Sequence, residues 1–407
     1  MRRVAITGLG AVTPLGLTAR SAFAAACEGV NGIGPLQVAD RDDYPHRLKQ
    51  KIAGQIKDFD PGDTLPEAEK SLYDRSAQFS MMAAREAVAA SGLVFDGELS
   101  TRSAVITGTG IGGIESIDNN AWRVYFEQKP RVHPFSVPRT MPSASASHIS
   151  MAFNIQGPAF TISSACSSAS HAIGEAYLMI SHGRVDVAVT GGTEAPLSLG
   201  CLISWQALRV MSNTACRPFS KDRNGMVLGE GAGIVVLEEM EAAKRRGAEI
   251  HGELVGYGLS ADAGDIVDPS PEGCARAIAQ CVNAAGLNSE DIGYINAHGT
   301  GTIANDRTET RALKLVLGAG TENVWVSSTK SMHGHALGGT AAMEFVLATQ
   351  AVRNGVLPPT INMTEPDPEC DLRHVKNQAV EAKIDVALSN SFAFGGLNAV
   401  LAIRRIR

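Results

Sequence analysis

The 407-residue chain lacks the features that mark several large classes of protein. Its seven cysteines include no CxxC pair, which argues against a disulfide-bonded secreted scaffold and against a thiolate zinc site. No window approaches the ~18 apolar residues of a membrane-spanning helix. The net charge of −6 leaves no basic excess, which argues against a general binder of nucleic acid. We therefore expect an ordinary globular protein of the cytoplasm.

Glycine is abundant, with 42 residues, and short β-branched runs alternate with alanine-rich stretches. The runs at 4–10, 103–110 and 185–192 predict strands. The stretches at 76–92 and 167–183 predict helices between these strands. This alternation predicts an α/β protein whose parallel strands are covered by helices.

The same rhythm starts again at 251–260, after a charged segment at 239–247. We expect two halves of similar fold, residues 1–250 and 251–407, within one compact body. The identity between the halves is too weak to prove this duplication from the sequence.

Three glycines, Gly108, Gly110 and Gly113, match the G-x-G-x-x-G pattern that holds a dinucleotide pyrophosphate at a helix N-terminus. The pattern alone is a weak signal, and no second strand ending in an acidic residue clearly follows it. We expect a glycine-rich bend beside a pocket here, and no NAD site.

Cys166 is the strongest candidate for a nucleophile. It follows the apolar run 159–165 and precedes a predicted amphipathic helix, so we expect its thiol at a helix N-terminus. There the helix dipole and free N–H groups lower the pKa of a thiol and can bind a developing oxyanion. Buried, inert thiols are the commonest alternative. We expect this state for five other cysteines: Cys27, Cys201, Cys274, Cys281 and Cys370.

Two histidines and a lysine follow predicted strands in the second half. His298 ends the stretch YINAHGTGT, and His335 lies in STKSMHGHALGG, five residues after Lys330. In α/β proteins the chemistry gathers at the carboxyl ends of strands, so we expect these side chains at one site. Spacing alone does not separate His335 from His333. His171, on the helix after the nucleophile, is expected to point to a different face.

Four separated motifs carry a resemblance to a known family. ACSSA around Cys166, NAHGTGT around His298, STKSMHGH around Lys330 and His335, and NSFAFGGLNA near the end resemble the β-ketoacyl-[acyl carrier protein] synthases. The likeness is strongest to the elongating type, with its Cys–His–His site, and spans about residues 2–405. It implies an α/β thiolase-like fold with five layers, αβαβα, in two similar halves, usually as a homodimer.

The resemblance also implies a reaction. Cys166 would take an acyl chain from a carrier-protein thioester, in an oxyanion hole formed by the backbone N–H groups of Cys166 and Phe394. Malonyl-carrier protein would then enter, with His298 and His335 as neutral imidazoles assisting its decarboxylation. Lys330 would organise the site. This acyltransferase reaction, a decarboxylating Claisen condensation, needs no redox cofactor and no catalytic metal, since the phosphopantetheine of acyl carrier protein carries the substrates.

Further positions match the family residue by residue. Thr300 and Thr302 match residues that bond the phosphopantetheine amides, Ile111 matches a residue of the acyl pocket, and Phe394 matches its gate. Three carboxylates are expected to support the site: Asp306, Glu309 and Glu344. Some members hold a structural monovalent cation at positions that match Asn296, Ala297, Glu344, Ser389 and Asn390.

The expected contacts to the carrier protein depart from the family pattern. The segment 65–74 is mostly acidic or neutral, where the family usually has basic residues. Lys129, Arg131 and Arg209 are the candidates left for this contact. Ala393 stands where the family usually has glycine, and because alanine accepts φ > 0 less readily, we expect a stiffer gate.

Two other functions fit the same fold. A non-catalytic chain-length-factor subunit would lack the active cysteine, whereas this chain keeps Cys166. A coenzyme A thiolase would need a second catalytic cysteine near the C-terminus, and Cys370 has no such context. Housekeeping fatty acid elongation and a specialised acyl or polyketide pathway both stay open, as do a homodimer and a heterodimer with a ketosynthase-like partner.

Overall fold

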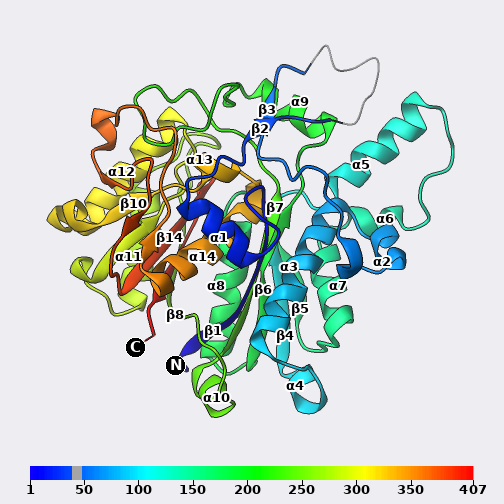
Figure 1. The fold of residues 1–407 in the computed structure, drawn as a ribbon, viewed down its shortest axis with the longest axis horizontal. Coiled ribbons are helices and arrows are strands. Elements are labelled where there is room, and N and C mark those ends of the chain that lie inside the picture. Colours follow the sequence, from blue (N-terminus) through cyan, green and yellow to red (C-terminus); the bar gives the residue numbers. More distant parts are fainter. Residues whose placement is uncertain (39–47, 407) are drawn as a thin grey trace.

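Two sets of five strands form the centre of the computed structural model, which describes residues 1–38 and 48–406 (Figure 1). The first set comprises β1 (Val4–Val12), β4 (Ser103–Gly108), β5 (Ala159–Ile162), β6 (Val187–Glu194) and β7 (Gly231–Glu239). The second comprises β8 (Gly252–Ala261), β9 (Ile292–Asn296), β10 (Trp325–Ser327), β14 (Val386–Ala393) and β15 (Leu397–Arg404). Antiparallel pairing of β1 with β8 joins the two sets, and β12 (Arg373–His374) extends the second beyond β10.

Both sets share one topology. The strand order is β5-β4-β6-β7-β1 in the first set and β10-β9-β14-β15-β8 in the second. In each order the first three strands run parallel and the last two are added antiparallel. The expected duplication of the fold is therefore present, whereas the boundary between residues 250 and 251 stays a prediction.

The predicted parallel strands are present in both sets, and the structure adds antiparallel strands that were not predicted. β15 returns antiparallel beside β14 because a tight turn connects the two, and a connection this short cannot cross over to a parallel position. No separate strand was predicted after residue 396, so β15 is a feature that the sequence did not indicate.

Helices complete five layers (Figure 1). α8 (Ser168–Ser181) and α14 (Leu337–Asn354) lie between the strand sets and contact both. α3 (Arg75–Ser91) and α7 (Ala144–Phe153) cover the outer face of the first set. α11 (Pro271–Ala284) and α12 (Ile303–Leu317) lie on the outer side of the second. This order of layers agrees with the αβαβα expectation.

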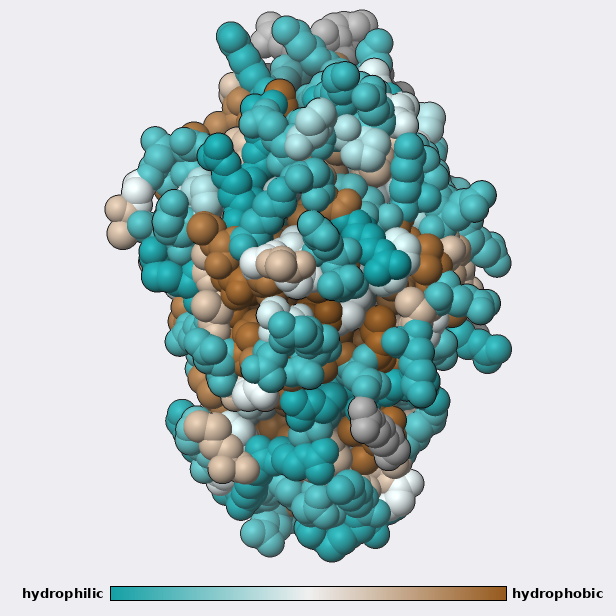
Figure 2. All heavy atoms as spheres, turned by 90° about the vertical axis from the view of Figure 1, so that its left-hand side faces the viewer, coloured by the Kyte–Doolittle hydropathy of each residue, from teal (hydrophilic) through white to brown (hydrophobic). Residues whose placement is uncertain are grey.

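Small residues let the central helices pack against strands on two sides. In α14, 15 of 18 residues are buried, as expected for a helix with no solvent face. A Cβ atom at Gly233 of β7 would lie 2.5 Å from the Ala342 carbonyl of α14, so this contact requires glycine. The outer side near α11 and α12 is instead mainly hydrophilic, with apolar residues near its centre (Figure 2).

Shorter elements connect these layers. The remaining helices are α1 (Ala19–Cys27), α2 (Glu67–Leu72), α4 (Gly97–Thr101), α5 (Ile114–Ala121), α6 (Ser136–Thr140), α9 (Leu199–Ala207), α10 (Met240–Arg245) and α13 (Lys330–His333). The short strands are β2 (Gly34–Pro35), β3 (Ile52–Ala53), β11 (Val356–Leu357) and β13 (Val380–Glu381). Within the described ranges no helix has the length and apolar character needed to span a membrane. The cytoplasmic location stays a prediction.

Candidate active site

Cys166 lies in the turn between β5 and α8, two residues before the helix begins. The preceding residue, Ala165, has φ of +51°, a left-handed conformation that is uncommon outside glycine. A Cβ atom at Gly108 of β4 would lie 2.4 Å from the backbone of α8, so glycine there lets this helix approach the strand. The sharp turn and the close helix together fix the position of the Cys166 thiol.

A cavity of about 180 Å³ brings the predicted residues of the two halves together. Cys166 comes from the first half, and five of its lining residues were predicted in the second: His298, Thr300, Thr302, His335 and Phe394. Apolar side chains make up much of the remaining wall, among them Trp205, Val210, Met226, Ile266 and Phe392. Cys166 and both imidazoles therefore face an apolar chamber that suits an aliphatic chain.

His335 contacts the nucleophile directly. Its Nε2 lies 3.1 Å from Cys166 Sγ, and its Nδ1 lies 3.0 Å from Thr340 Oγ1. His333 instead lies against Gly334 and Thr329, with ring nitrogens 2.7 and 3.0 Å from their oxygens. The structure thus separates the two histidines that spacing could not.

His298 lies beside His335, with ring centroids 5.5 Å apart and planes at 84°. The backbone N–H groups of His298 and Gly299 donate to the Glu309 carboxylate, at 2.9 and 2.8 Å. Burial, and next the charge of Lys330, hold the pKa of both imidazoles well below the usual 6.5. Both rings are therefore neutral at pH 7, and Glu309 fixes the backbone that carries one of them.

The protonation state of Cys166 differs from the prediction. Burial raises the pKa of its thiol to about 11, although the Lys330 charge and the backbone N–H groups of Phe394 and Cys166 act in the opposite direction. The backbone N–H groups do lower this pKa as predicted, but burial has the larger effect, so the net prediction of a lowered pKa is wrong. The thiol needs a base, and His335 is in place. The same two N–H groups are the ones expected to form the oxyanion hole.

Lys330 and Glu344 form a buried ion pair. Lys330 Nζ lies 2.7 Å from Glu344 Oε1, and both side chains are 1% exposed. Neither residue lines the cavity, so Lys330 acts on Cys166 and the histidines through its charge. The structure thus places Lys330 and Glu344 together, while Asp306 and Glu309 lie elsewhere around the site.

The loop that carries Thr300 and Thr302 is held by Asp306. The two threonine hydroxyls lie 2.8 Å apart at the cavity wall. Asp306 Oδ1 accepts a hydrogen bond from the Gly301 N–H between them, at 3.3 Å. Thr302 also caps α12, since its hydroxyl accepts from the N–H of Asn305. The expected supporting role of Asp306 therefore has a concrete geometry.

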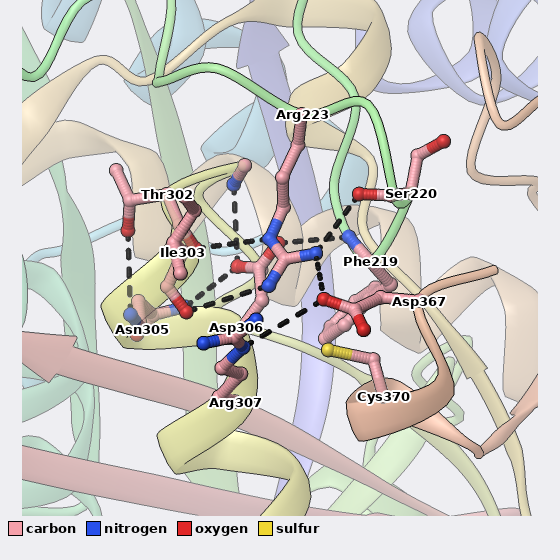
Figure 3. Close-up of polar contacts among 12 residues, drawn as sticks. Phe219, Ser220, Arg223, Thr302, Ile303, Asn305, Asp306, Arg307, Asp367 and Cys370 are labelled. Atoms are coloured by element: carbon pink, nitrogen blue, oxygen red, sulfur yellow. Dashed lines mark hydrogen bonds and ion pairs between the residues drawn. The ribbon is translucent and has the colours of Figure 1, made fainter.

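Arg223, which the sequence analysis did not single out, completes this support (Figure 3). Its guanidinium lies 2.7 Å from an Asp367 oxygen and 3.4 Å from Asp306 Oδ2, and it donates to the Thr302 carbonyl at 3.3 Å. The Arg223 side chain is 1% exposed. Cys370 lies in the same cluster and does not line the cavity, so it cannot act as a second catalytic cysteine beside the nucleophile.

The gate residues differ in detail from the expectation. Phe394 lines the cavity and stacks on Trp205, with ring centroids 5.8 Å apart. Positive φ values in this loop occur at Gly395 (+81°) and Gly396 (+66°), and Ala393 is not among the described residues with positive φ. The expectation that Ala393 stiffens the gate through its φ is therefore wrong, because glycine occupies both positions that need it.

The remaining predicted residues lie away from the thiol. Ile111 does not line the cavity but packs behind it, in one apolar cluster with the lining residue Met226. Lys129, Arg131 and Arg209 are exposed, and Lys129 pairs with Glu127 at 2.8 Å. Their contact with a carrier protein stays a prediction.

Glu194, at the end of β6, was missed. Its buried carboxylate accepts hydrogen bonds from Thr109 Oγ1 (2.9 Å) and from the N–H groups of Gly110 (2.5 Å), Ile111 (3.1 Å) and Gly338 (3.1 Å). Two of these N–H groups belong to the GTGIGG bend, which is therefore filled by a carboxylate rather than shaped for a pyrophosphate. The sequence feature that could have indicated Glu194 is an acidic residue directly after the apolar run VAVTGGT.

Neutral oxygen atoms at the end of β9 and in the middle of β14 fit a monovalent cation. Asn296 Oδ1, Ser389 Oγ and Asn390 Oδ1 are buried without a hydrogen-bond partner. Asn296 and Ser389 are register partners on the two strands, and Asn390 is the next residue. Buried polar atoms without partners call for an explanation, and a bound ion supplies one. Among the described residues, no group of three or more His, Cys, Asp or Glu side chains could hold a metal ion.

A cysteine facing two neutral histidines, at the meeting point of two similar αβ halves, defines a condensing enzyme of the thiolase-like class. The family model described as Beta-ketoacyl synthase, N-terminal domain matches residues 1–243, and the C-terminal domain model matches residues 251–364. The chain belongs to the β-ketoacyl synthase family.

Relatives match over the full length of the chain. It is 45% identical to Nodulation protein E of Rhizobium sp. (strain N33), covering 100% of both chains. It is 42% identical to 3-oxoacyl-[acyl-carrier-protein] synthase 2 of a Synechocystis species, covering 99% of this chain and 98% of that one. The solved structure of the ishigamide ketosynthase/chain length factor aligns with a TM-score of 0.93 at 35% identity, covering 100% of both chains.

Proposed function

We propose that this acyltransferase joins an acyl group held on Cys166 to a malonyl unit delivered by acyl carrier protein, releasing a 3-oxoacyl product. One observation carries the proposal: Cys166 Sγ lies 3.1 Å from His335 Nε2 inside an apolar cavity. The relative named as a 3-oxoacyl-[acyl-carrier-protein] synthase supports this reaction and this carrier. A chain-length factor has no use for such a cysteine–histidine contact.

In the first half-reaction, Cys166 Sγ attacks the thioester carbonyl while its proton passes to Nε2 of His335. The backbone N–H groups of Cys166 and Phe394 stabilise the oxyanion, a contribution of about 3 kcal/mol per donor in comparable sites. When the intermediate collapses, the bond to the carrier sulfur breaks, and that sulfur takes up the proton. Because burial holds the thiol protonated at rest, this transfer depends on the 3.1 Å contact.

In the second half-reaction, the malonyl carbon–carboxylate bond breaks and carbon dioxide leaves. The resulting enolate oxygen accepts hydrogen bonds from Nε2–H groups of neutral imidazoles at His298 and His335. For this step His335 carries its proton on Nε2 and its Nδ1 accepts from the Thr340 hydroxyl, the reverse of the tautomer that takes the Cys166 proton. The carbanion attacks the acyl carbonyl on Cys166, whose sulfur leaves as a thiolate and takes up one proton from solvent water. A neutral imidazole can donate without a prior charge, and burial keeps both rings in that state.

The experiment is a product assay with purified enzyme, octanoyl-carrier protein and malonyl-carrier protein. The wild type is expected to release carbon dioxide and a 3-oxodecanoyl product, and Cys166→Ala is expected to form no product. His298→Ala is expected to keep acylation of Cys166 but lose condensation. Product formation by Cys166→Ala, or none by the wild type with any acyl donor, would contradict the proposal.

We also propose a homodimer built across the edge of β5, the last strand in its sheet order. Phe160 on this strand is 40% exposed, and Met151 of the neighbouring α7 is 76% exposed. An unpaired edge flanked by exposed apolar side chains is a typical interaction surface. Sedimentation of the wild type is expected to show a dimer and Phe160→Asp a monomer. The control is Val94→Asp, at an exposed valine outside β5 and α7. A monomeric wild type that dimerises only with a ketosynthase-like partner would contradict this.

We further propose that Asn296, Ser389 and Asn390 hold a structural monovalent cation. Such an ion would balance partial negative charge on their oxygens and take no part in bond-making. Melting temperatures in potassium, sodium and choline chloride at equal ionic strength test this. The metal salts are expected to raise the melting temperature above the choline value, and Ser389→Ala to reduce that difference. Equal melting temperatures in the three salts would count against the ion.

A further inference from the structure

The Glu194 carboxylate connects two segments of the chain, the bend after β4 and the start of α14. On one side it accepts from Thr109, Gly110 and Ile111, which form the bend after β4. On the other it accepts from Gly338 in the first turn of α14. All four donors converge on one fully buried side chain, so the bend and the helix start are held by a single group.

Both connected segments supply side chains to one apolar cluster behind the acyl cavity. Ile111 belongs to this cluster, and so does Leu337, the residue before Gly338. Three further members, Trp205, Val210 and Met226, line the cavity itself. The position of the cavity wall therefore depends on the two segments that Glu194 joins.

The surrounding backbone is shaped around this carboxylate. A Cβ atom at Gly110 would lie 3.0 Å from Glu194 Oε2, and one at Gly338 would lie 2.8 Å from the same oxygen and 2.1 Å from the Gly110 nitrogen. Leu337 has φ of +41°, a strained conformation for leucine. Strain of this kind persists only where neighbouring contacts over-determine the backbone, and it gathers at functional sites.

We propose that Glu194 is a positioning residue that sets the acyl-chain selectivity of the enzyme, by fixing Ile111 and Leu337 behind the cavity wall. The inference rests on the proposed function, because selectivity is expressed in the acylation of Cys166. A fixed wall discriminates against chains that are too long or too short, whereas a loosened wall adapts to several. In Glu194→Gln the amide NH2 group is a donor, and it faces a place where four donors already converge. We expect the bend after β4 and the start of α14 to move apart.

The experiment compares the wild type, Glu194→Gln and Glu86→Gln. Glu86 is a matched control, because its carboxylate also accepts backbone N–H groups from two segments, at Ala11 and Ala19, but it does not line or back the cavity. The initial rate of Cys166 acylation is followed by intact-protein mass with saturated acyl-carrier proteins of six to sixteen carbons. The readout is the ratio between the rate for the preferred donor and the mean rate for donors two carbons longer and shorter.

Glu194→Gln is expected to lower this ratio about tenfold, within the range that one or two methylenes contribute to discrimination. Glu86→Gln is expected to leave it unchanged. An unchanged ratio in a folded Glu194→Gln enzyme overturns the inference, whatever happens to the absolute rate. If the wild type forms no adduct with any donor, it is the proposed function that fails.

Thr109→Val decides the matter if Glu194→Gln does not fold. This substitution removes one of the four donors and keeps both the carboxylate and the size of the side chain. The selectivity ratio is expected to fall in the same direction by about threefold, as for the loss of one buried hydrogen bond. A ratio equal to that of the wild type overturns the inference.

Discussion

The sulfur of Cys166 lies 3.1 Å from Nε2 of His335, and Nδ1 of the same ring lies 3.0 Å from the Thr340 hydroxyl. The first contact joins the two halves of the duplicated fold, since Cys166 precedes α8 and His335 precedes α14. These two helices form the central layer, so the contact between Cys166 and His335 depends on how the halves pack together.

The Thr340 contact orients the base. Thr340→Val removes the partner of Nδ1 and keeps the shape of the side chain. We expect the acylation rate of Cys166 to fall about tenfold. One lost hydrogen bond raises the activation barrier by about 1 to 1.5 kcal/mol. Thr349→Val in the same helix is the control, because the Thr349 hydroxyl donates only to the Phe345 carbonyl. Equal loss in both variants would show that helix stability, and not the histidine, is responsible.

The pH dependence follows from the buried imidazoles. Because the pKa values of His298 and His335 are lowered, both rings stay neutral as the pH falls through the range where an ordinary histidine, with pKa near 6.5, gains its proton. We expect the acylation rate to stay constant from about pH 8 to about pH 6 and to fall only below that. Single-turnover acylation across this range, with circular dichroism to follow folding, provides the measurement. Half-loss of rate near pH 6.5 would contradict the account.

The buried ion pairs of Arg223 hold the threonine loop and contribute to the free energy of unfolding. Arg223→Gln leaves the buried Asp306 without its cation and leaves Asp367 with the more exposed Arg307, and we expect the free energy of unfolding to fall by about 3 kcal/mol. Arg307→Gln is the comparison, because Arg307 also pairs with Asp367 but its side chain is 42% exposed. For that variant we expect a loss of less than about 1 kcal/mol. Urea unfolding at one protein concentration measures both, and equal losses would refute the role assigned to burial.

The Phe394 loop positions an oxyanion donor. Gly396 has φ of +66°, and a Cβ atom there would lie 2.4 Å from the Asp262 Cβ, so Gly396→Ala forces the loop to move. We expect the acylation rate to fall about 100-fold, as for loss of one oxyanion donor.

The matched control for this loop is Gly264→Ala, since a Cβ atom at Gly264 meets nothing within 4 Å. Acylation with one donor at saturating concentration, in both variants, isolates the chemical step. A Gly396→Ala enzyme as fast as the Gly264→Ala enzyme would show that the Phe394 N–H is dispensable.

Much of the site could be predicted from the sequence because its motifs are local. Cys166 lies in a strand–turn–helix segment, and His298 and His335 follow strands, so the residues themselves indicate where their side chains emerge. The α/β alternation likewise predicted α3 and α8, at 76–92 and 167–183. The antiparallel β15 was missed because it belongs to a continuous apolar stretch in which only the turn at Gly395 and Gly396 marks two strands.

The contacts that the sequence did not reveal are long-range. Arg223 meets Asp367 across 144 positions, and Glu194 meets Gly338 across another 144, so neither pairing leaves a local pattern. The thiol pKa was wrongly predicted for a related reason. The helix N-terminus is visible in the sequence, whereas the burial that outweighs it depends on residues from the other half of the fold.

The most direct test of the account is the intact mass of the enzyme after incubation with an acyl-carrier protein, for the wild type and for Cys166→Ala. We predict that the wild type gains the mass of one acyl group and that the variant gains none. An adduct of equal mass and amount on Cys166→Ala, or no adduct on the wild type with any donor from six to sixteen carbons, would contradict the assignment of Cys166 as the nucleophile.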